Sequence, residues 1–415
     1  MERRVVITGL GAVTCLGNTL KETWDLILKG ETGIDTVTYF DPTPFRTHMA
    51  GQVKNFDIEK YMPIKEARRL DPFCQFAIAA AEEALENAGI TKNISESLNP
   101  ERVGVLVSSG IGGLQTMQEQ ADILREKGPS KVSPFFIPMM IADLAAGNIA
   151  MRYGAKGPNM GIVTACASST HSIGEAFWMI KRDDADVMIV GGAEASITPV
   201  GFGGFCAMKA MSQRNDDPKT ASRPFDKGRD GFVMGEGSGI LIMEELEHAK
   251  KRGANILAEI VGYGASADAH HITAPAPGAS GAVQAINMAF KHARIPVTDV
   301  NYINAHGTST PLNDKFETAA YKTVFGNHAK SISISSLKGS IGHNLGAAGA
   351  LETVCAVKGI SEDIVPQTLN YSELDPECDL DYTPNAPRKL KINTVLKVNM
   401  GFGGHNAALL LKKFK

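Results

Sequence analysis

Long hydrophobic runs, paired cysteines and an excess of charge of one sign are all missing from this sequence. No window approaches 18 uninterrupted apolar residues, which excludes an ordinary membrane-spanning helix. The six cysteines include no CxxC pair and no His/Cys spacing typical of a zinc site, and a chain of 415 residues needs no disulfides to stabilise its core. The formal net charge of −3 gives no sign of a nucleic-acid-binding surface.

The first residues, MERRVVITGLGAV, lead directly into a predicted strand, without the apolar core of a signal peptide. We therefore expect a cytoplasmic protein that binds neither membrane nor nucleic acid and holds no metal. The turn that follows contains Gly9 and Gly11, but Thr14 stands where a dinucleotide-binding turn has its third glycine. No acidic residue ends a second strand about 20 residues later, so a dinucleotide site is disfavoured.

Glycine-rich turns follow buried strands in both halves of the chain. The turn GLGA after the first strand recurs as GYGA, and VLVSSGIG recurs as YINAHGTS. The segment around Cys166 has a counterpart in SISISSLKGSIGH, and VMIVGGAEA has one in VLKVNMGFGG. Four units in the same order predict an internal duplication. We place the two halves at residues 1–253 and 254–415.

Each predicted half alternates buried strands with helices, which is typical of an α/β fold with a mainly parallel central sheet. Two such sheets in one chain stack most simply through shared helices. The turns at the strand ends of both halves would then converge on one site, because ligands of such folds gather there. The apolar segment 132–150 is either core or an interface with another subunit.

Cys166 lies in GIVTACASSTHSIGEAF, a pattern that predicts a short strand, a sharp bend and a helix. A thiol at the start of a helix meets unpaired N–H groups and the positive end of the helix dipole, which favour the thiolate. Small neighbours leave room for a ligand to approach the sulfur. The sequence therefore predicts a nucleophile on a sharp bend, and a buried structural cysteine is the alternative.

The second half carries His306, Lys338 and His343 at the corresponding turns, and Phe402 in the last glycine-rich turn. Any one of these residues could be structural. Two histidines, a lysine and a thiol at matching strand ends of duplicated units are hard to explain by packing alone, so they predict a shared catalytic site.

The motifs VTACASS, NAHGTSTPLND, SSLKGSIGHNLGAAG and GFGGHN resemble those of the elongating, type II β-ketoacyl-acyl carrier protein synthases of fatty acid synthesis. The resemblance covers essentially the whole chain. It implies a thiolase-like fold with α-β-α-β-α layers, a homodimer, and a decarboxylating condensation of acyl and malonyl thioesters. No cofactor is implied beyond the phosphopantetheine arm, which arrives on the carrier protein.

The resemblance also implies a role for individual residues. Cys166 would accept the acyl chain, His306 and His343 would act on the malonyl thioester, and Lys338 would support the second histidine. The N–H groups of Cys166 and Phe402 would form the oxyanion hole. The remaining implied residues line the acyl pocket (Ile111, Phe205, and Phe402 as its gate), hold the phosphopantetheine arm (Thr308, Thr310) or dock the acidic carrier protein (Lys65, Arg68, Arg69).

One run departs from the family pattern. Ahead of the gate, VNMGFGG replaces a more polar run of the NSFGFGG type. We expect the activity to be unchanged and the mobility of the gate to differ.

Two neutral imidazole N–H groups can stabilise the enolate that forms when malonyl loses CO₂, without a metal.

Other functions stay open at this point. A thiolase, a polyketide-type ketosynthase, a non-elongating thiolase-like acyltransferase and a chain-length-factor partner share the fold. A thiolase normally needs a second cysteine and takes coenzyme A, and the partner would lack Cys166. A cysteine hydrolase would use one histidine and admit water.

Overall fold

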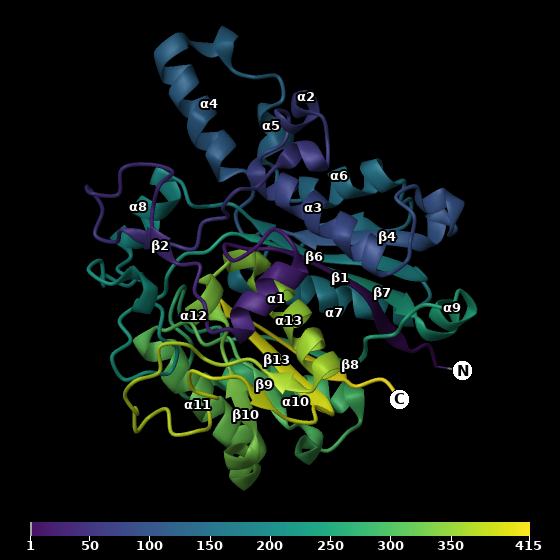
Figure 1. Cartoon of the computed structure of the whole chain (residues 1–415), viewed down its shortest axis with the longest axis vertical. Coiled ribbons are helices and arrows are strands. Elements are labelled where there is room, and N and C mark those ends of the chain that lie inside the picture. The colour runs from purple at the N-terminus through teal and green to yellow at the C-terminus, as the bar shows by residue number, and fades with distance from the viewer. Residues whose placement is uncertain (1) are drawn as a thin grey trace.

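Ten strands form one continuous sheet in the computed structural model, which describes residues 2–415 (Figure 1). The first half of the chain contributes β1 (Val5–Val13), β4 (Val103–Ser108), β5 (Asn159–Met160), β6 (Val187–Glu194) and β7 (Gly237–Glu245). The second half contributes β8 (Ala258–Ala267), β9 (Tyr302–Asn304), β10 (Ser333–Ser335), β13 (Thr394–Gly401) and β14 (His405–Lys412).

The order of strands repeats from one half to the other. It runs β5-β4-β6-β7-β1 in the first half and β10-β9-β13-β14-β8 in the second. Each of the four strand units matched in the sequence occupies the same place in both halves. The chosen boundary at residue 253 falls between α9 (Leu246–Lys251) and β8.

The two half-sheets stack through shared helices, as the sequence predicted, and they are also joined edge to edge. β1 pairs with β8 in an antiparallel ladder from Val5–Ile7 to Ala258–Ile260. Both strands lie at the edge of their own half, and an edge strand has backbone groups free to pair. The joint makes one sheet of the two.

Each half contains two parallel and two antiparallel ladders, so the sheet is mixed. β4 and β9 take part in the parallel ladders of their halves. β13 and β14 are antiparallel because only Phe402, Gly403 and Gly404 connect them, and a parallel pair needs a long crossover.

Helices form three layers, one between the two half-sheets and one on the outer face of each (Figure 1). α7 (Ser168–Lys181) and α13 (Ala348–Glu362) lie in the centre and contact strands of both halves. α3 (Pro72–Asn87) and α6 (Leu144–Tyr153) cover the first half, and α10 (Ser280–Ala293) with α11 (Pro311–Phe325) covers the second. Nearly every residue of α13 is buried and most of them are small or apolar, which is typical of a helix packed between layers.

The remaining elements are short or lie at the surface. They are α1 (Leu20–Leu28), α2 (Ile64–Ala67), α4 (Leu114–Lys127), α5 (Phe136–Met140), α8 (Pro199–Ala207), α12 (Lys338–Ile341), and the strand pairs β2 (Asp35–Thr36) with β3 (Met49–Ala50) and β11 (Ile364–Val365) with β12 (Arg388–Lys389). Within residues 2–415, every helix is too short or too polar to cross a bilayer.

The apolar segment 132–150 divides between core and surface. Ala145, Ala146 and Ile149 on α6 are buried, whereas Ile137 and Ile141 are exposed. The core alternative therefore holds for the α6 part of the segment, and an interface at its exposed part stays a prediction.

Candidate active site

Cys166 lies on a strained bend immediately before α7. The preceding residue, Ala165, has φ 50°, a left-handed conformation that residues with a Cβ rarely adopt. The Ser168 hydroxyl holds the bend, since it donates to the Ala165 carbonyl at 2.7 Å and accepts from the Thr164 N–H at 2.9 Å. The predicted bend and helix are present, but the predicted strand at 162–163 is not: β5 ends at Met160.

The Cys166 thiol is not poised as a thiolate, which corrects the expectation from the helix dipole. Its residue is only 8% exposed. This burial raises the pKa of the thiol to about 12, although the Lys338 ammonium and the N–H of Phe402 act in the opposite direction. In the free protein the sulfur therefore carries its proton.

The turn that contains Phe402 reaches the cysteine because position 401 is glycine. A Cβ on Gly401 would lie 2.7 Å from the Thr164 carbonyl oxygen and 3.2 Å from the Cys166 nitrogen, too close for any side chain. The N–H of Phe402 points at the Cys166 thiol. The two proposed oxyanion donors therefore come from backbone segments in direct contact.

His306 and His343 lie side by side, with ring centroids 5.3 Å apart and planes at 85°. His306 follows β9, and His343 follows α12. Both rings are buried. Burial lowers the pKa of each imidazole well below 6.5, and the Lys338 ammonium lowers it further. Both histidines are therefore neutral at neutral pH.

Hydrogen bonds to Nδ1 determine the tautomer of both rings. Nδ1 of His306 accepts from the side-chain amide of Asn399 at 3.1 Å, and Nδ1 of His343 accepts from the Leu345 N–H at 3.3 Å. In a neutral imidazole the proton must then be on Nε2. Residues 2–415 offer neither Nε2 a hydrogen-bond partner, so both N–H groups remain available to a ligand.

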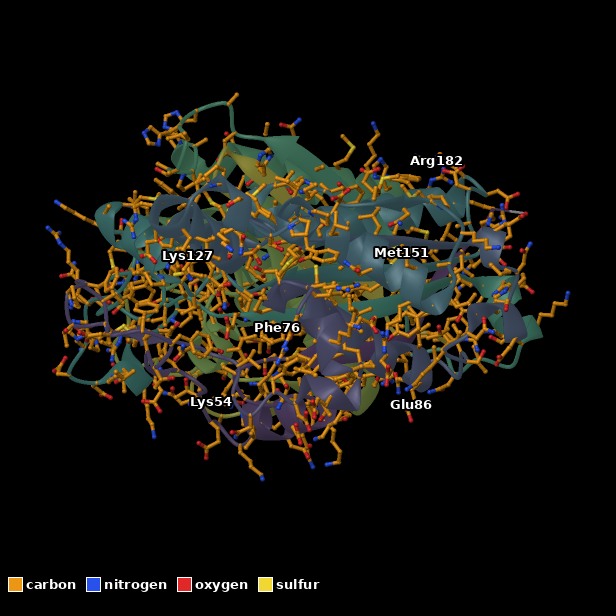
Figure 2. All side chains as sticks on the ribbon, turned by 90° about the horizontal axis from the view of Figure 1, so that it is seen from above. Lys54, Phe76, Glu86, Lys127, Met151 and Arg182 are labelled. Carbon is orange, nitrogen blue, oxygen red and sulfur yellow. The ribbon has the colours of Figure 1, made fainter. Side chains whose placement is uncertain are left out.

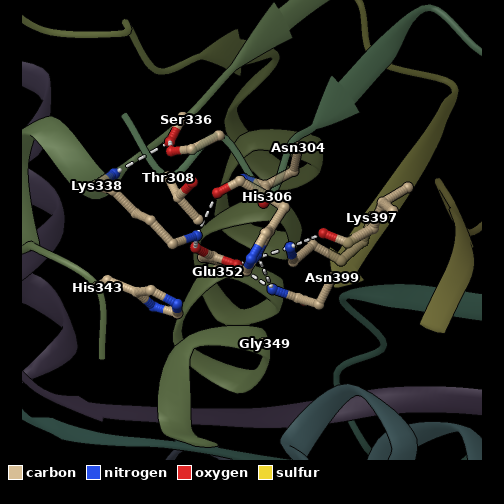
Figure 3. Close-up of polar contacts among 12 residues, drawn as sticks. Asn304, His306, Thr308, Ser336, Lys338, His343, Gly349, Glu352, Lys397 and Asn399 are labelled. Carbon is tan, nitrogen blue, oxygen red and sulfur yellow. Dashed lines mark hydrogen bonds and ion pairs between the residues drawn. The ribbon is translucent and has the colours of Figure 1, made fainter. Parts of the chain in front are cut away.

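Lys338 contacts the main chain of the first histidine directly and acts on the second, the one named by the resemblance, through its charge. Its ammonium group donates to the main-chain carbonyl of His306 and to the carboxylate of Glu352 (Figure 3). It reaches His343 only through its charge. The reason is local: α12 begins at Lys338 and directs the side chain toward α13 and the end of β9.

Glu352 is a buried carboxylate that sequence analysis missed. It also pairs with the ammonium of Lys397 at 2.7 Å. Burial acts to raise the pKa of Glu352, but the two ammonium groups outweigh it and the pKa is lowered. The sequence did carry a signal for this pair: Glu352 lies in an otherwise apolar helix, and Lys397 lies in a largely apolar strand.

Glu317 on α11 is a second missed carboxylate. It accepts hydrogen bonds from the backbone N–H groups of His306 and Gly307, at 2.6 and 2.7 Å. Glu317 thereby fixes the backbone of the turn that carries His306, while Asn399 fixes the orientation of its ring.

A cavity of about 370 Å³ connects these groups. Its lining includes seven of the predicted residues: Cys166, Phe205, Thr308, Thr310, His306, His343 and Phe402. The hydroxyls of Thr308 and Thr310 are 2.9 Å apart. Lys338 is not among the residues that line the cavity. Ile111 is absent from the lining and 40% exposed, so within one chain the structure does not bring it to this cavity.

The predicted docking residues Lys65, Arg68 and Arg69 are exposed on and just after α2, outside the cavity lining. The Arg69 guanidinium lies 4.6 Å from the centre of the Phe135 ring. The carboxylate of Glu66, which lies between Lys65 and Arg68 in the chain, pairs with Arg152 at 2.8 Å. Lys65, Arg68 and Arg69 remain exposed on the surface.

Comparisons with known proteins agree along the whole chain. Residues 2–249 match the family described as Beta-ketoacyl synthase, N-terminal domain, and residues 257–372 match Beta-ketoacyl synthase, C-terminal domain. The chain is 51% identical over 414 residues to 3-oxoacyl-acyl-carrier-protein synthase 2 of Synechocystis sp., covering 100% of this chain and 99% of the relative. The same enzyme of Staphylococcus aureus is also 51% identical, with the same coverage.

Solved structures give the same result. A beta-ketoacyl synthase from Burkholderia phymatum has a TM-score of 0.92 and 35% identity over 100% of both chains. A type II polyketide ketosynthase, solved in complex with its acyl-carrier protein, has a TM-score of 0.91 and 35% identity, again over 100% of both chains.

Proposed function

We propose that Cys166, His306 and His343 carry out the reaction of this chain, which belongs to the beta-ketoacyl synthase family. The chain is a condensing enzyme, a 3-oxoacyl-acyl-carrier-protein synthase of fatty acid elongation. The observation that supports these roles most directly is the single cavity lined by the thiol and both imidazoles.

In the first step the Cys166 sulfur attacks the carbonyl of an acyl thioester. The C–S bond to the incoming phosphopantetheine breaks, and the proton of the Cys166 thiol ends on the departing sulfur. The N–H groups of Cys166 and Phe402 stabilise the oxyanion of the tetrahedral intermediate. A thiol that is protonated at rest suits this exchange because the leaving thiol needs that proton.

In the second step a malonyl thioester loses CO₂, and the electron pair of the broken C–C bond forms an enolate. Its charge develops on the thioester oxygen, where the Nε2–H groups of His306 and His343 can donate. The enolate carbon attacks the acyl group on Cys166. The Cys166 sulfur leaves and regains a proton from solvent, and 3-oxoacyl thioester is released.

We infer that the substrates arrive on an acyl carrier protein. Thr308 and Thr310 at the cavity would hold the phosphopantetheine arm, and Phe205 would line the acyl pocket. Lys65, Arg68 and Arg69 form an exposed basic cluster suited to an acidic carrier protein.

We also propose a homodimer, built at the free edge of the sheet. The edge strand β5 and its neighbours carry exposed apolar side chains, among them Val163 at 57% and Met151 at 72%. Met151 is labelled in Figure 2. An edge strand with an apolar surround is a natural place for a second copy to pair. Ile111 could then face an acyl pocket completed by the partner.

The competing functions differ in specific ways. A thiolase needs a second cysteine at the site, and Cys166 is the one cysteine among the described residues that line the cavity. A cysteine hydrolase would release the acyl group to water. Two neutral imidazoles that both present N–H groups suit enolate stabilisation better than activation of water.

The test separates the two half-reactions. His306→Ala and His343→Ala should each abolish CO₂ release from malonyl carrier protein while acyl transfer to Cys166 stays measurable by mass spectrometry. His328→Ala, at a histidine outside the cavity lining, should retain both. Hydrolysis of acyl carrier protein without CO₂ release in the unmodified enzyme would contradict the proposal.

A further inference from the structure

Asn399 is the polar residue of the run in which this chain departs from the family pattern, and its side chain contacts the catalytic network. It lies on β13, fully buried, three residues before Phe402. Its amide nitrogen donates to Nδ1 of His306 at 3.1 Å and to the carboxylate of Glu352 at 3.0 Å (Figure 3). One NH₂ group therefore links the histidine to the buried carboxylate.

The amide has one orientation that satisfies its neighbours. Its oxygen accepts from the Thr170 hydroxyl at 2.6 Å. If the amide were reversed, its oxygen would face the Glu352 carboxylate, which accepts only, and its NH₂ group would face Thr170. The Thr170 hydroxyl and the Glu352 carboxylate thus hold the NH₂ group toward His306 from opposite sides.

Glycine at position 349 makes this arrangement possible. A Cβ there would lie 2.0 Å from the Thr170 hydroxyl oxygen and 3.0 Å from the Asn399 amide oxygen. α13 can approach α7 and β13 closely only without that atom. Elements from both halves of the chain therefore converge to orient one amide.

Lys397 holds the other end of the network. It lies two residues before Asn399 on β13, so both side chains project from the same face of the strand. Its ammonium binds the Glu352 oxygen that also accepts from Asn399, and it donates to the Val398 carbonyl at 2.7 Å. The carboxylate is thereby fixed in the position that the Asn399 amide needs.

We propose that Asn399 is a positioning residue for the condensation: it keeps Nδ1 of His306 unprotonated and so directs the Nε2–H group of His306 into the cavity. Thr170 acts through it by fixing which end of the amide faces the ring. This inference rests on the proposed function, because the Nε2–H group matters only if it stabilises the enolate.

Four proteins test the proposal: wild type, Asn399→Leu, Thr170→Val and Thr170→Ser. The tautomer of His306 is read by ¹⁵N NMR of histidine-labelled protein without substrate. Acyl transfer to Cys166 is read by intact mass, and decarboxylation by CO₂ release from malonyl carrier protein. Thr170→Val removes the hydroxyl at nearly constant volume, so the test does not depend on Asn399→Leu folding.

We expect wild type and Thr170→Ser to show an Nε2–H tautomer at His306. Asn399→Leu and Thr170→Val should show increased protonation at Nδ1 and slower decarboxylation, by about 10- to 100-fold, the range seen when groups that orient other functional histidines are removed. Acyl transfer should be unchanged, because His306 takes no part in it.

Two results would overturn the proposal: a wild-type tautomer and decarboxylation rate in Asn399→Leu, or identical behaviour of Thr170→Val and Thr170→Ser. A failure of the proposed function looks different. If the wild-type enzyme neither acylates Cys166 nor releases CO₂, the condensation mechanism fails, while the tautomer measured without substrate still decides what Asn399 does.

Discussion

The ammonium group of Lys397 lies 2.7 Å from the carboxylate of Glu352, and neither side chain reaches solvent. Lys338 binds the other oxygen of the same carboxylate. One buried negative charge therefore serves two buried positive charges beside His306. Removing the carboxylate must cost more than removing one of the ammonium groups.

Glu352→Gln should lower the free energy of unfolding by about 3–5 kcal/mol, because it leaves two buried ammonium groups without their counter-charge. Lys397→Met should cost clearly less, since Glu352 keeps Lys338. Urea denaturation of both variants at one pH provides the comparison. Equal losses would show that the carboxylate is not the centre of the cluster.

The neutral histidines predict a particular pH dependence. Because the pKa of His306 and His343 in the folded protein is well below 6.5, CO₂ release by Cys166→Gln should stay constant as the pH falls from 8 to about 6.5, the ordinary histidine pKa, and decline only below it. The two rings stay neutral in the fold while unfolded histidines take up protons below about 6.5, so stability should fall as the pH drops through that range. If the decarboxylation rate of Cys166→Gln already halves near pH 7, the result would contradict the neutral, buried state of the His306 and His343 rings.

Cys166→Gln should abolish condensation and retain decarboxylation. The glutamine amide resembles the carbonyl of the acylated cysteine, while the two histidine donors are untouched. The assay measures CO₂ and 3-oxoacyl product separately. Cys74→Ala, at a buried cysteine on α3, serves as the control and should retain both products; a Cys166→Ala enzyme that condenses at the wild-type rate would refute the nucleophile.

Gly401→Ala should disable the oxyanion hole. The added Cβ would clash with the Thr164 carbonyl and push the Phe402 N–H away from Cys166. We expect a loss of about 10²–10³-fold in condensation rate, the usual result of removing one such donor. Gly204→Ala is the matched control, because nothing lies within 4 Å of a Cβ at that position on α8.

Reversing the charges of Lys65, Arg68 and Arg69 should weaken binding of acyl carrier protein and leave the rate with a small pantetheine thioester unchanged. The loss should be larger at low ionic strength, where exposed charges are screened less. The triple reversal of the exposed Lys330, Lys389 and Lys391 is the control. Equal effects of the two triple variants would place the docking surface elsewhere.

The sequence was most informative where chemistry and local geometry coincide. The small residues around Cys166 predicted a bend before a helix, and the glycines near Phe402 predicted a tight turn. Both are present. The repeated strand units also predicted the matching order of strands in the two halves.

Sequence analysis failed where the outcome depends on residues far apart in the chain. The thiolate was expected from the helix end alone, but burial of the thiol among residues distant in the chain outweighs the effect of the helix end. The charge of Lys338 acts on His343, but its direct contacts with Glu352 and with the carbonyl of His306 were not predicted. Ile111 was expected in the cavity and lies outside it. No local sequence pattern predicts which buried carboxylate will form an ion pair with an isolated lysine.

The most direct test of the proposed mechanism is a peptide mass map after incubation of the enzyme with acyl carrier protein thioesters of graded length. We predict a single acyl adduct per chain on the peptide that contains Cys166, lost when malonyl carrier protein is added and 3-oxoacyl product appears. An adduct on any other cysteine, or product formation while Cys166 remains unmodified, would contradict the mechanism.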